Sequence, residues 1–86
     1  MNINELIAIV KKRLFDQIKI ENLEIQDKSF LHKNHKGNQK GKFHLKISLK
    51  SNQLKEMNKI ESNKKIFKIL DKEIKNFIHS IQILIN

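Results

Sequence analysis

Histidine is the residue type in this 86-residue chain with the clearest chemical potential, because imidazole binds metals and changes charge near neutral pH. Three of the four histidines, His32, His35 and His44, lie in the segment 27–50, which also carries seven lysines and whose only acidic residue is its first. The fourth, His79, opens the C-terminal apolar run. The chain has no cysteine, which excludes a thiolate cluster or a disulfide scaffold built from this chain alone. The choice is therefore between a shared metal site and a basic docking surface.

The formal net charge of +9 invites a nucleic-acid interpretation, because lysines near phosphates release condensed counterions on binding. Arg13 is the only arginine among the 18 basic residues, and Ile and Asn are also abundant, a mix that is typical of an AT-rich genome. Bidentate recognition of guanine or phosphate favours arginine, so the composition argues against sequence-specific DNA recognition. A lysine surface for nucleic acid and a solvated surface without a partner both stay open.

The length predicts one domain over residues 1–86, with room for a single core. We expect no enzyme, because the sequence shows no nucleophile beside a base and an orienting acid and no glycine-rich phosphate loop. Asn4 and Glu5 interrupt the N-terminus where a secretory signal would need an apolar run, and no stretch approaches 18 apolar residues. A cytoplasmic protein without membrane contact is the expectation.

The N-terminal segment 2–15 has the spacing of an amphipathic helix. Its apolar positions are Ile3, Leu6, Ile7, Val10 and Leu14. Asn2 is the expected N-cap, and Glu5 three positions later completes a capping-box spacing. The basic run 11–13 suits the negative end of the helix dipole and is interpreted as a solvated helix end.

Two strands are predicted next, over 18–27 and from Phe43 onward. In the second, apolar residues alternate with His44, Lys46 and Ser48, which indicates one wet face and places His44 on the surface. The connection 28–42 is long for a hairpin and contains both glycines of the chain. Connections of more than about 12 residues tend to be functional or disordered.

After Ser51, Leu54 and Met57 indicate a short turn, and an apolar stripe then predicts one long helix. The stripe consists of Ile66, Phe67, Leu70, Ile74 and Phe77. Asn58 and Glu61 repeat the spacing of a cap and its partner. The acidic residues Glu61, Asp71 and Glu73 are interpreted as helix-surface charges.

The last predicted strand is 79–85, in which His79 shares one face with Ile81, Ile83 and Ile85. That parity is typical of a core histidine hydrogen-bonded to the backbone. A helix between the second and third strands acts as a crossover, so those strands should be parallel and the hairpin pair antiparallel. The expected fold class is α+β, with a three-stranded mixed sheet and the helices packed on one face.

With this order, the run from Leu23 to His32, followed by His35 and Gly37, resembles the first strand and loop of the BolA family. The segment 78–81, Ile-His-Ser-Ile, is similar to the Ile/Val-His-Ala-Leu run that starts the last strand of that family. Three helix positions between them also match, Phe67, Leu70 and Glu73. The chain departs from the family at Ser62-Asn63-Lys64, where many members carry Arg-His-Arg, and at Lys42, where Thr-His-Phe commonly opens the second strand.

The resemblance implies a class II KH-like fold, α-β-β-(short turn)-α-β, and a non-enzymatic role in iron–sulfur maturation or in iron and redox regulation. Members pair with monothiol glutaredoxins and share a [2Fe-2S] cluster, for which the glutaredoxin cysteine and glutathione supply thiolates. Carried onto this sequence, the ligands are His79 and His32, with His35 in reserve. Mixed Cys/His ligation raises the reduction potential of such a cluster. The chain alone is expected to hold no cofactor and to be a monomer or weak homodimer.

The alternative is a KH-like nucleic-acid-binding transcription regulator. KH domains clamp the backbone with a Gly-x-x-Gly loop, but the corresponding segment 51–58 contains no glycine. What remains for DNA or RNA is a lysine surface that we expect to bind weakly, with strong salt dependence and little sequence preference. Its candidate residues are Lys40, Lys42, Lys59, Lys64, Lys65 and Lys68.

Overall fold

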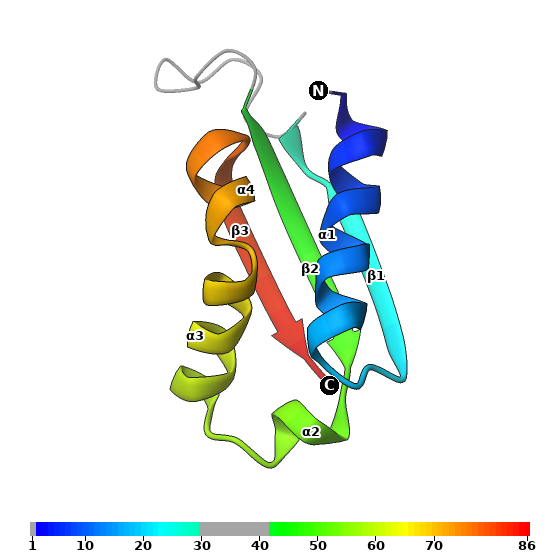
Figure 1. Cartoon of the computed structure of the whole chain (residues 1–86), viewed down its shortest axis with the longest axis vertical. Helices are drawn as coiled ribbons and strands as arrows, with labels where there is room; N and C mark the ends of the chain where they lie inside the picture. Colours follow the sequence, from blue (N-terminus) through cyan, green and yellow to red (C-terminus); the bar gives the residue numbers. More distant parts are fainter. Residues whose placement is uncertain (1, 30–41) are drawn as a thin grey trace.

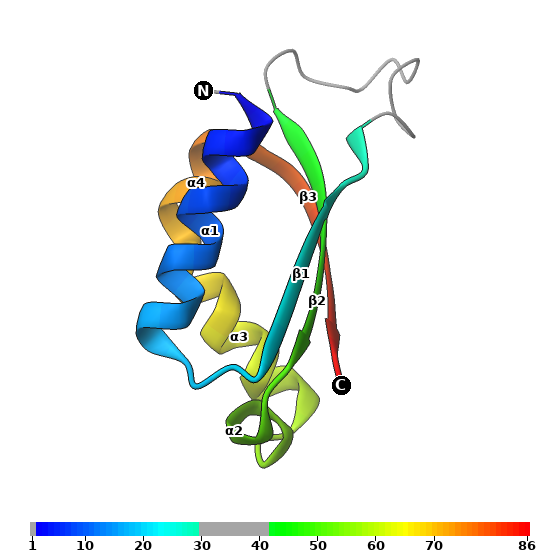
Figure 2. The same ribbon diagram turned by 90° about the vertical axis from the view of Figure 1, so that its right-hand side faces the viewer.

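The fold, seen in a computed structural model that describes residues 2–29 and 42–86, has helices on one side of a small sheet. The elements in chain order are α1 (Ile3–Gln17), β1 (Asn22–Asp27), β2 (Phe43–Lys50), α2 (Asn52–Lys55), α3 (Lys59–Ile69), α4 (Asp71–Asn76) and β3 (Ile78–Ile85). Helices α1, α3 and α4 cover one face of the sheet, and no helix of the described ranges lies on the other (Figure 1, Figure 2). The predicted α+β class is confirmed.

Local capping signals begin the helices where the sequence predicts. The Glu5 backbone N–H donates to Asn2 Oδ1 at 2.8 Å, and the Glu61 N–H donates to Asn58 Oδ1 at 2.8 Å. Each bond satisfies one amide that a helix start leaves without an intrahelical partner. Helix α1 continues to Gln17, so the basic run 11–13 lies more than a turn from its expected place at the helix end.

The sheet has the order β1-β2-β3, with β1 antiparallel and β3 parallel to β2. Both strand directions were predicted from the hairpin and the crossover. The first strand starts at Asn22 rather than at residue 18, because Ile18 is the C-cap of α1 and its N–H donates to the Leu14 carbonyl at 2.9 Å.

The core lies between the helices and the covered face of the sheet. Its buried side chains include Leu6, Val10 and Leu14 of α1, Leu45, Ile47 and Leu49 of β2, Leu54 of α2, Ile66 of α3, and Leu70 between α3 and α4. The central strand contributes alternate residues, and α1 contributes residues one turn apart, as the two periodicities require. Each of these aliphatic side chains stabilises the fold by about 1.5–3 kcal/mol through its burial.

The predicted long helix is wrong in one respect, because it is divided into α3 and α4 at Leu70. The backbone of Leu70, at φ −97° and ψ 13°, leaves the helical region. No proline or glycine lies nearby, and the Leu70 side chain is fully buried. Packing of that side chain into the core therefore holds the bend. None of the helices in the two described ranges is both long and apolar enough to span a membrane.

Candidate functional site

A β-bulge at the start of β3 determines where His79 lies. Phe43 pairs with Ile78, the next pair is His44 with Ser80, and His79 has no partner in this ladder. A bulge adds one residue and resets the alternation of side chains. Ile78 and Ile81 therefore both pack on the core although they are three residues apart. His79 is exposed instead, so the prediction from parity that it shares the core face with Ile81 is wrong.

His44 was predicted to be a surface residue, and the structure buries it to 4% exposure. It lies on the helix-free face of β2, where its Nδ1 is 2.6 Å from Ser80 Oγ. Its ring meets the His79 ring edge to face, with centroids 4.9 Å apart and planes at 61°. Two imidazoles from neighbouring strands are therefore in contact on this helix-free face of the sheet, called the open face below. The His79 ring is exposed, and the His44 ring is buried.

The chain segment that leads toward the remaining histidines is anchored beside this pair. The Ser29 hydroxyl accepts the backbone N–H of His44 at 3.1 Å, and the Lys28 N–H donates to the His44 carbonyl at 2.7 Å. Ser29 is in turn held by Asp27, whose Oδ1 accepts the Ser29 N–H at 2.9 Å. His32 and His35 lie outside the described residues, so their ligand roles stay predictions.

An open groove of about 490 Å³ adjoins the pair on the outer face of the sheet. Besides His44 and Ser80, it is lined by Lys28, Lys46 and Gln82. Lys46 adds a positive charge to this surface, which favours an anionic neighbour. Within residues 2–29 and 42–86, no group of three or more His, Cys, Asp or Glu side chains is placed to hold a metal ion.

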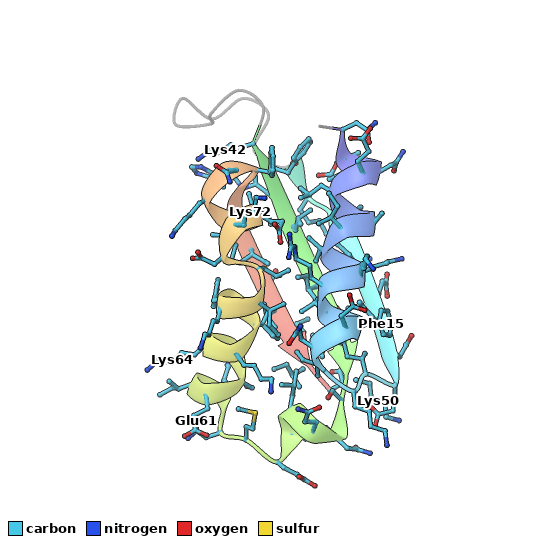
Figure 3. All side chains as sticks on the ribbon, viewed as in Figure 1. Phe15, Lys42, Lys50, Glu61, Lys64 and Lys72 are labelled. Atoms are coloured by element: carbon cyan, nitrogen blue, oxygen red, sulfur yellow. The ribbon has the colours of Figure 1, made fainter. Side chains whose placement is uncertain are left out.

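Among the described candidate lysines, Lys42 lies apart from the others. Lys42 lies at the start of β2, where its Nζ is 3.5 Å from the Lys75 carbonyl, whereas Lys59, Lys64, Lys65 and Lys68 belong to α3. Lys42 and Lys64 are well separated along the long axis of the molecule (Figure 3). Lys65 and Lys68 do come together, with Arg13, around a groove of about 510 Å³ between α1 and α3. Lys40 lies outside the described ranges.

The position of Glu73 also differs from the prediction. It was interpreted as a helix-surface charge, but it is only 3% exposed, and its Oε1 lies 2.5 Å from Arg13 Nε. Arg13, interpreted as part of a solvated helix end, is instead the counter-ion of a buried carboxylate. Asp71 and Glu61 are exposed as predicted, and Asp71 forms an ion pair with Lys75 at 3.1 Å.

Comparisons with known proteins agree with the resemblance seen in the sequence. The structure is similar to BolA1 from Arabidopsis thaliana, with a TM-score of 0.78, 21% identity, and coverage of 92% of this chain and 87% of the other. It is also similar to the BolA domain of SufE1 from the same plant, with a TM-score of 0.77, 20% identity, and coverage of 92% of this chain and 87% of the other. For a Bol-like protein from Babesia bovis the TM-score is 0.70 and the identity 15%, with coverage of 91% of this chain and 79% of the other. At these identities the similarities establish the fold.

A search of curated protein sequences finds no match. The family model described as BolA-like protein matches residues 14–86, which includes β1, the bulge and His79. A match over so much of the sequence establishes the family. The chain belongs to the BolA-like protein family.

Proposed function

We propose that this protein is a non-enzymatic adaptor that pairs with a monothiol glutaredoxin and shares a [2Fe-2S] cluster with it, in iron–sulfur maturation or in iron and redox regulation. The observation that carries the proposal is the exposed imidazole of His79 at the start of β3. Family membership supports the same assignment. In a regular strand, residue 79 would share the core face with Ile81. The bulge changes this alternation, so that the His79 ring is exposed and accessible to a visiting protein.

In this proposal His79 is the first ligand that the chain contributes and His32 is the second, with His35 in reserve. The remaining ligands are thiolates of the glutaredoxin and of glutathione, which this cysteine-free chain has to obtain from its partner. A ligand imidazole is neutral and is usually oriented by its surroundings. A bound cluster would supply electron-transfer chemistry and could itself be passed to an acceptor protein. The chain supplies neutral imidazole donors, which raise the reduction potential of the cluster above that of an all-thiolate cluster.

The surroundings of His79 suit that role. The buried His44 ring packs against it, and the contact between His44 Nδ1 and Ser80 Oγ fixes the position of His44. Lys46 in the adjoining groove favours anionic neighbours, and both glutathione and a thiolate-ligated cluster are anionic. The anchored segment at Ser29 begins the route toward His32 beside the same pair.

The test is reconstitution of the full chain with a monothiol glutaredoxin, glutathione and an iron–sulfur source. We expect a visible absorption and circular dichroism spectrum that differs from that of the glutaredoxin homodimer. His79→Ala should abolish this heterodimeric spectrum and leave the far-UV circular dichroism of the chain unchanged, because the side chain is exposed. An unaltered visible spectrum for His79→Ala contradicts the proposal.

For His32→Ala the expected effect is milder, with a cluster that forms and is transferred more rapidly to an acceptor protein. His35→Ala tests the reserve ligand: while His32 is present, it should leave the transfer rate near that of the wild type. Equal transfer rates for wild type and His32→Ala would remove the loop histidine from the mechanism.

A further inference from the structure

Strand β3 has a free edge in the described sheet. The sheet order places β2 on one side of β3 and no described strand on the other. The Asn86 N–H donates to the Leu49 carbonyl at 2.8 Å, which shows that the even-numbered residues at this end of β3 direct their backbone groups toward β2. Because these groups alternate along a strand, those of Ile81, Ile83 and Ile85 point away from β2.

This edge lacks the usual protection against pairing with another strand. Natural sheet edges carry charges, prolines or bulges that discourage an added strand. The eight residues of β3 contain no charged side chain and no proline, although the chain has a net charge of +9, and the bulge lies only at the start of the strand. The opposite edge strand, β1, carries Glu24 and Asp27.

A groove of about 330 Å³ runs beside the C-terminal half of this edge. The last three residues of β3 form one wall, and Leu54 and Met57 supply apolar lining from the α2 region. Leu84 is 41% exposed here, which is high for a large aliphatic side chain. Lys55 and Lys59, both exposed, also line the groove and are its charged residues.

We propose that this site binds an extended, acidic peptide segment of another protein as an added β-strand. The outward backbone groups of Ile81, Ile83 and Ile85 would pair with the peptide backbone, an apolar side chain of the peptide would enter the groove, and a carboxylate would face Lys55 and Lys59. Strand addition of this kind takes its affinity from main-chain hydrogen bonds and its specificity from side-chain pockets.

Two other occupants fit the chemistry less well. Single-stranded nucleic acid is bound by stacking of bases on aromatic side chains, and the described residues that line this groove include none. A second copy of this chain would bring another +9 charge, and its own β3 has no acidic residue to face the two lysines. Charge complementarity therefore selects an acidic peptide. This site is separate from the histidine pair and does not depend on the glutaredoxin proposal.

The probe is a fluorescein-labelled ten-residue peptide, Glu-Glu-Val-Thr-Ile-Thr-Val-Thr-Glu-Glu, measured against the full chain by fluorescence anisotropy at about 0.15 M salt. We expect it to bind at least about tenfold more tightly than the same peptide with lysine in place of its glutamates, a difference of about 1.4 kcal/mol. N-methylation of alternate backbone amides should abolish binding. Amide chemical-shift changes should concentrate on residues 81–85.

Charge-matched variants separate a local site from general attraction. Lys55→Gln/Lys59→Gln should weaken binding by about fivefold, whereas Lys64→Gln/Lys72→Gln, which makes the same charge change on other exposed helix positions, should change it less than about twofold. Lys64 and Lys72 are both visible on the helices in Figure 3. Equal weakening by the two pairs of substitutions would contradict the proposal.

Three further outcomes would overturn it. They are no binding at millimolar peptide, amide shift changes at residues 81–85 with oligo(dT) but not with the peptide, and a homodimer in sedimentation velocity that forms through β3 and that the peptide does not dissociate. The last two would assign the edge to nucleic acid and to a second copy of the chain, respectively.

Discussion

At the scale of single residues, the pair formed by His44 and His79 is the most specific feature of the open face. One ring is buried and the other exposed, and they meet at 4.9 Å with an edge-to-face angle of 61°. A buried histidine needs partners for its ring nitrogens, and Ser80 Oγ at 2.6 Å from Nδ1 provides one. His44 therefore acts as a fixed support for the more exposed ring.

This support predicts a coupling between His44 and Ser80. His44→Ala should lower the free energy of unfolding by about 1–3 kcal/mol, because it removes a buried ring and a hydrogen bond, and Ser80→Ala should lower it by about 0.5–1.5 kcal/mol. In the double variant the loss should be smaller than the sum of the two, by about 1 kcal/mol. Urea unfolding of the four proteins measures the cycle.

Ser48→Ala provides the control for that cycle, since Ser48 lies on the same face of β2 four residues further along. The decrease in unfolding free energy caused by Ser48→Ala should add to the decrease caused by His44→Ala. If the effects of His44→Ala and Ser80→Ala add just as simply, the contact at 2.6 Å contributes no stability.

At the scale of elements, the bulge predicts an unusual tolerance to deletion. Removing His79 would leave Ile78, Ser80 and Ile81 in regular alternation opposite Phe43, His44 and Leu45, with every core side chain still inward. We expect this deletion to cost less than about 2 kcal/mol of unfolding free energy. Removing Gln82 instead would turn Ile83 and Ile85 to the open face, each at a cost of about 1.5–3 kcal/mol.

Urea unfolding and the amide spectrum of β3 distinguish the two deletions. The chain without His79 should unfold cooperatively and keep its β3 resonances, whereas the chain without Gln82 should lose most of its folded population. A deletion of His79 as damaging as that of Gln82 would mean that the extra residue is part of the strand register.

The elements that sequence reasoning found are those with local signals. Asn2 and Asn58 cap helices through bonds to residues three positions away, and the alternation in β2 follows from its own side chains. The misplaced features have no local signal. The bulge at His79 is set by pairing with β2, the bend at Leu70 by burial, and the pairing of Glu73 by a helix about 60 residues earlier in the chain.

The candidate site divides along the same line. The family pattern singles out His79, and its exposure is compatible with the proposed ligand role. His44 was missed because alternation within β2 indicates a wet face, and the sequence does not reveal that His79 and Ser80 lie across from it. A short polar residue such as Ser80 opposite a histidine is a signal for such a contact, and reading it requires the strand register.

At the scale of the whole molecule, the ion pair of Arg13 and Glu73 joins the first helix to the last. Glu73 in α4 is buried, and Arg13 in α1 has a side chain that is 44% exposed. A carboxylate in this environment requires its counter-ion, because an unpaired buried charge is strongly destabilising. Arg13 also lines the groove between α1 and α3, together with Lys65 and Lys68.

Replacing one partner should therefore be worse than replacing both. Arg13→Met leaves the Glu73 carboxylate buried and unpaired and should lower the free energy of unfolding by about 1–3 kcal/mol, a range reduced to allow for the exposure of the arginine. Arg13→Met/Glu73→Met should recover most of that loss, because replacing a buried pair by apolar side chains is often neutral.

Lys12→Met is the control, because it breaks an ion pair with Asp16 in which both side chains are exposed. It should change the free energy of unfolding by no more than about 0.5 kcal/mol. Thermal and urea unfolding measure all three variants. A double variant less stable than Arg13→Met would show that Glu73 is held by its packing, with no dependence on the arginine.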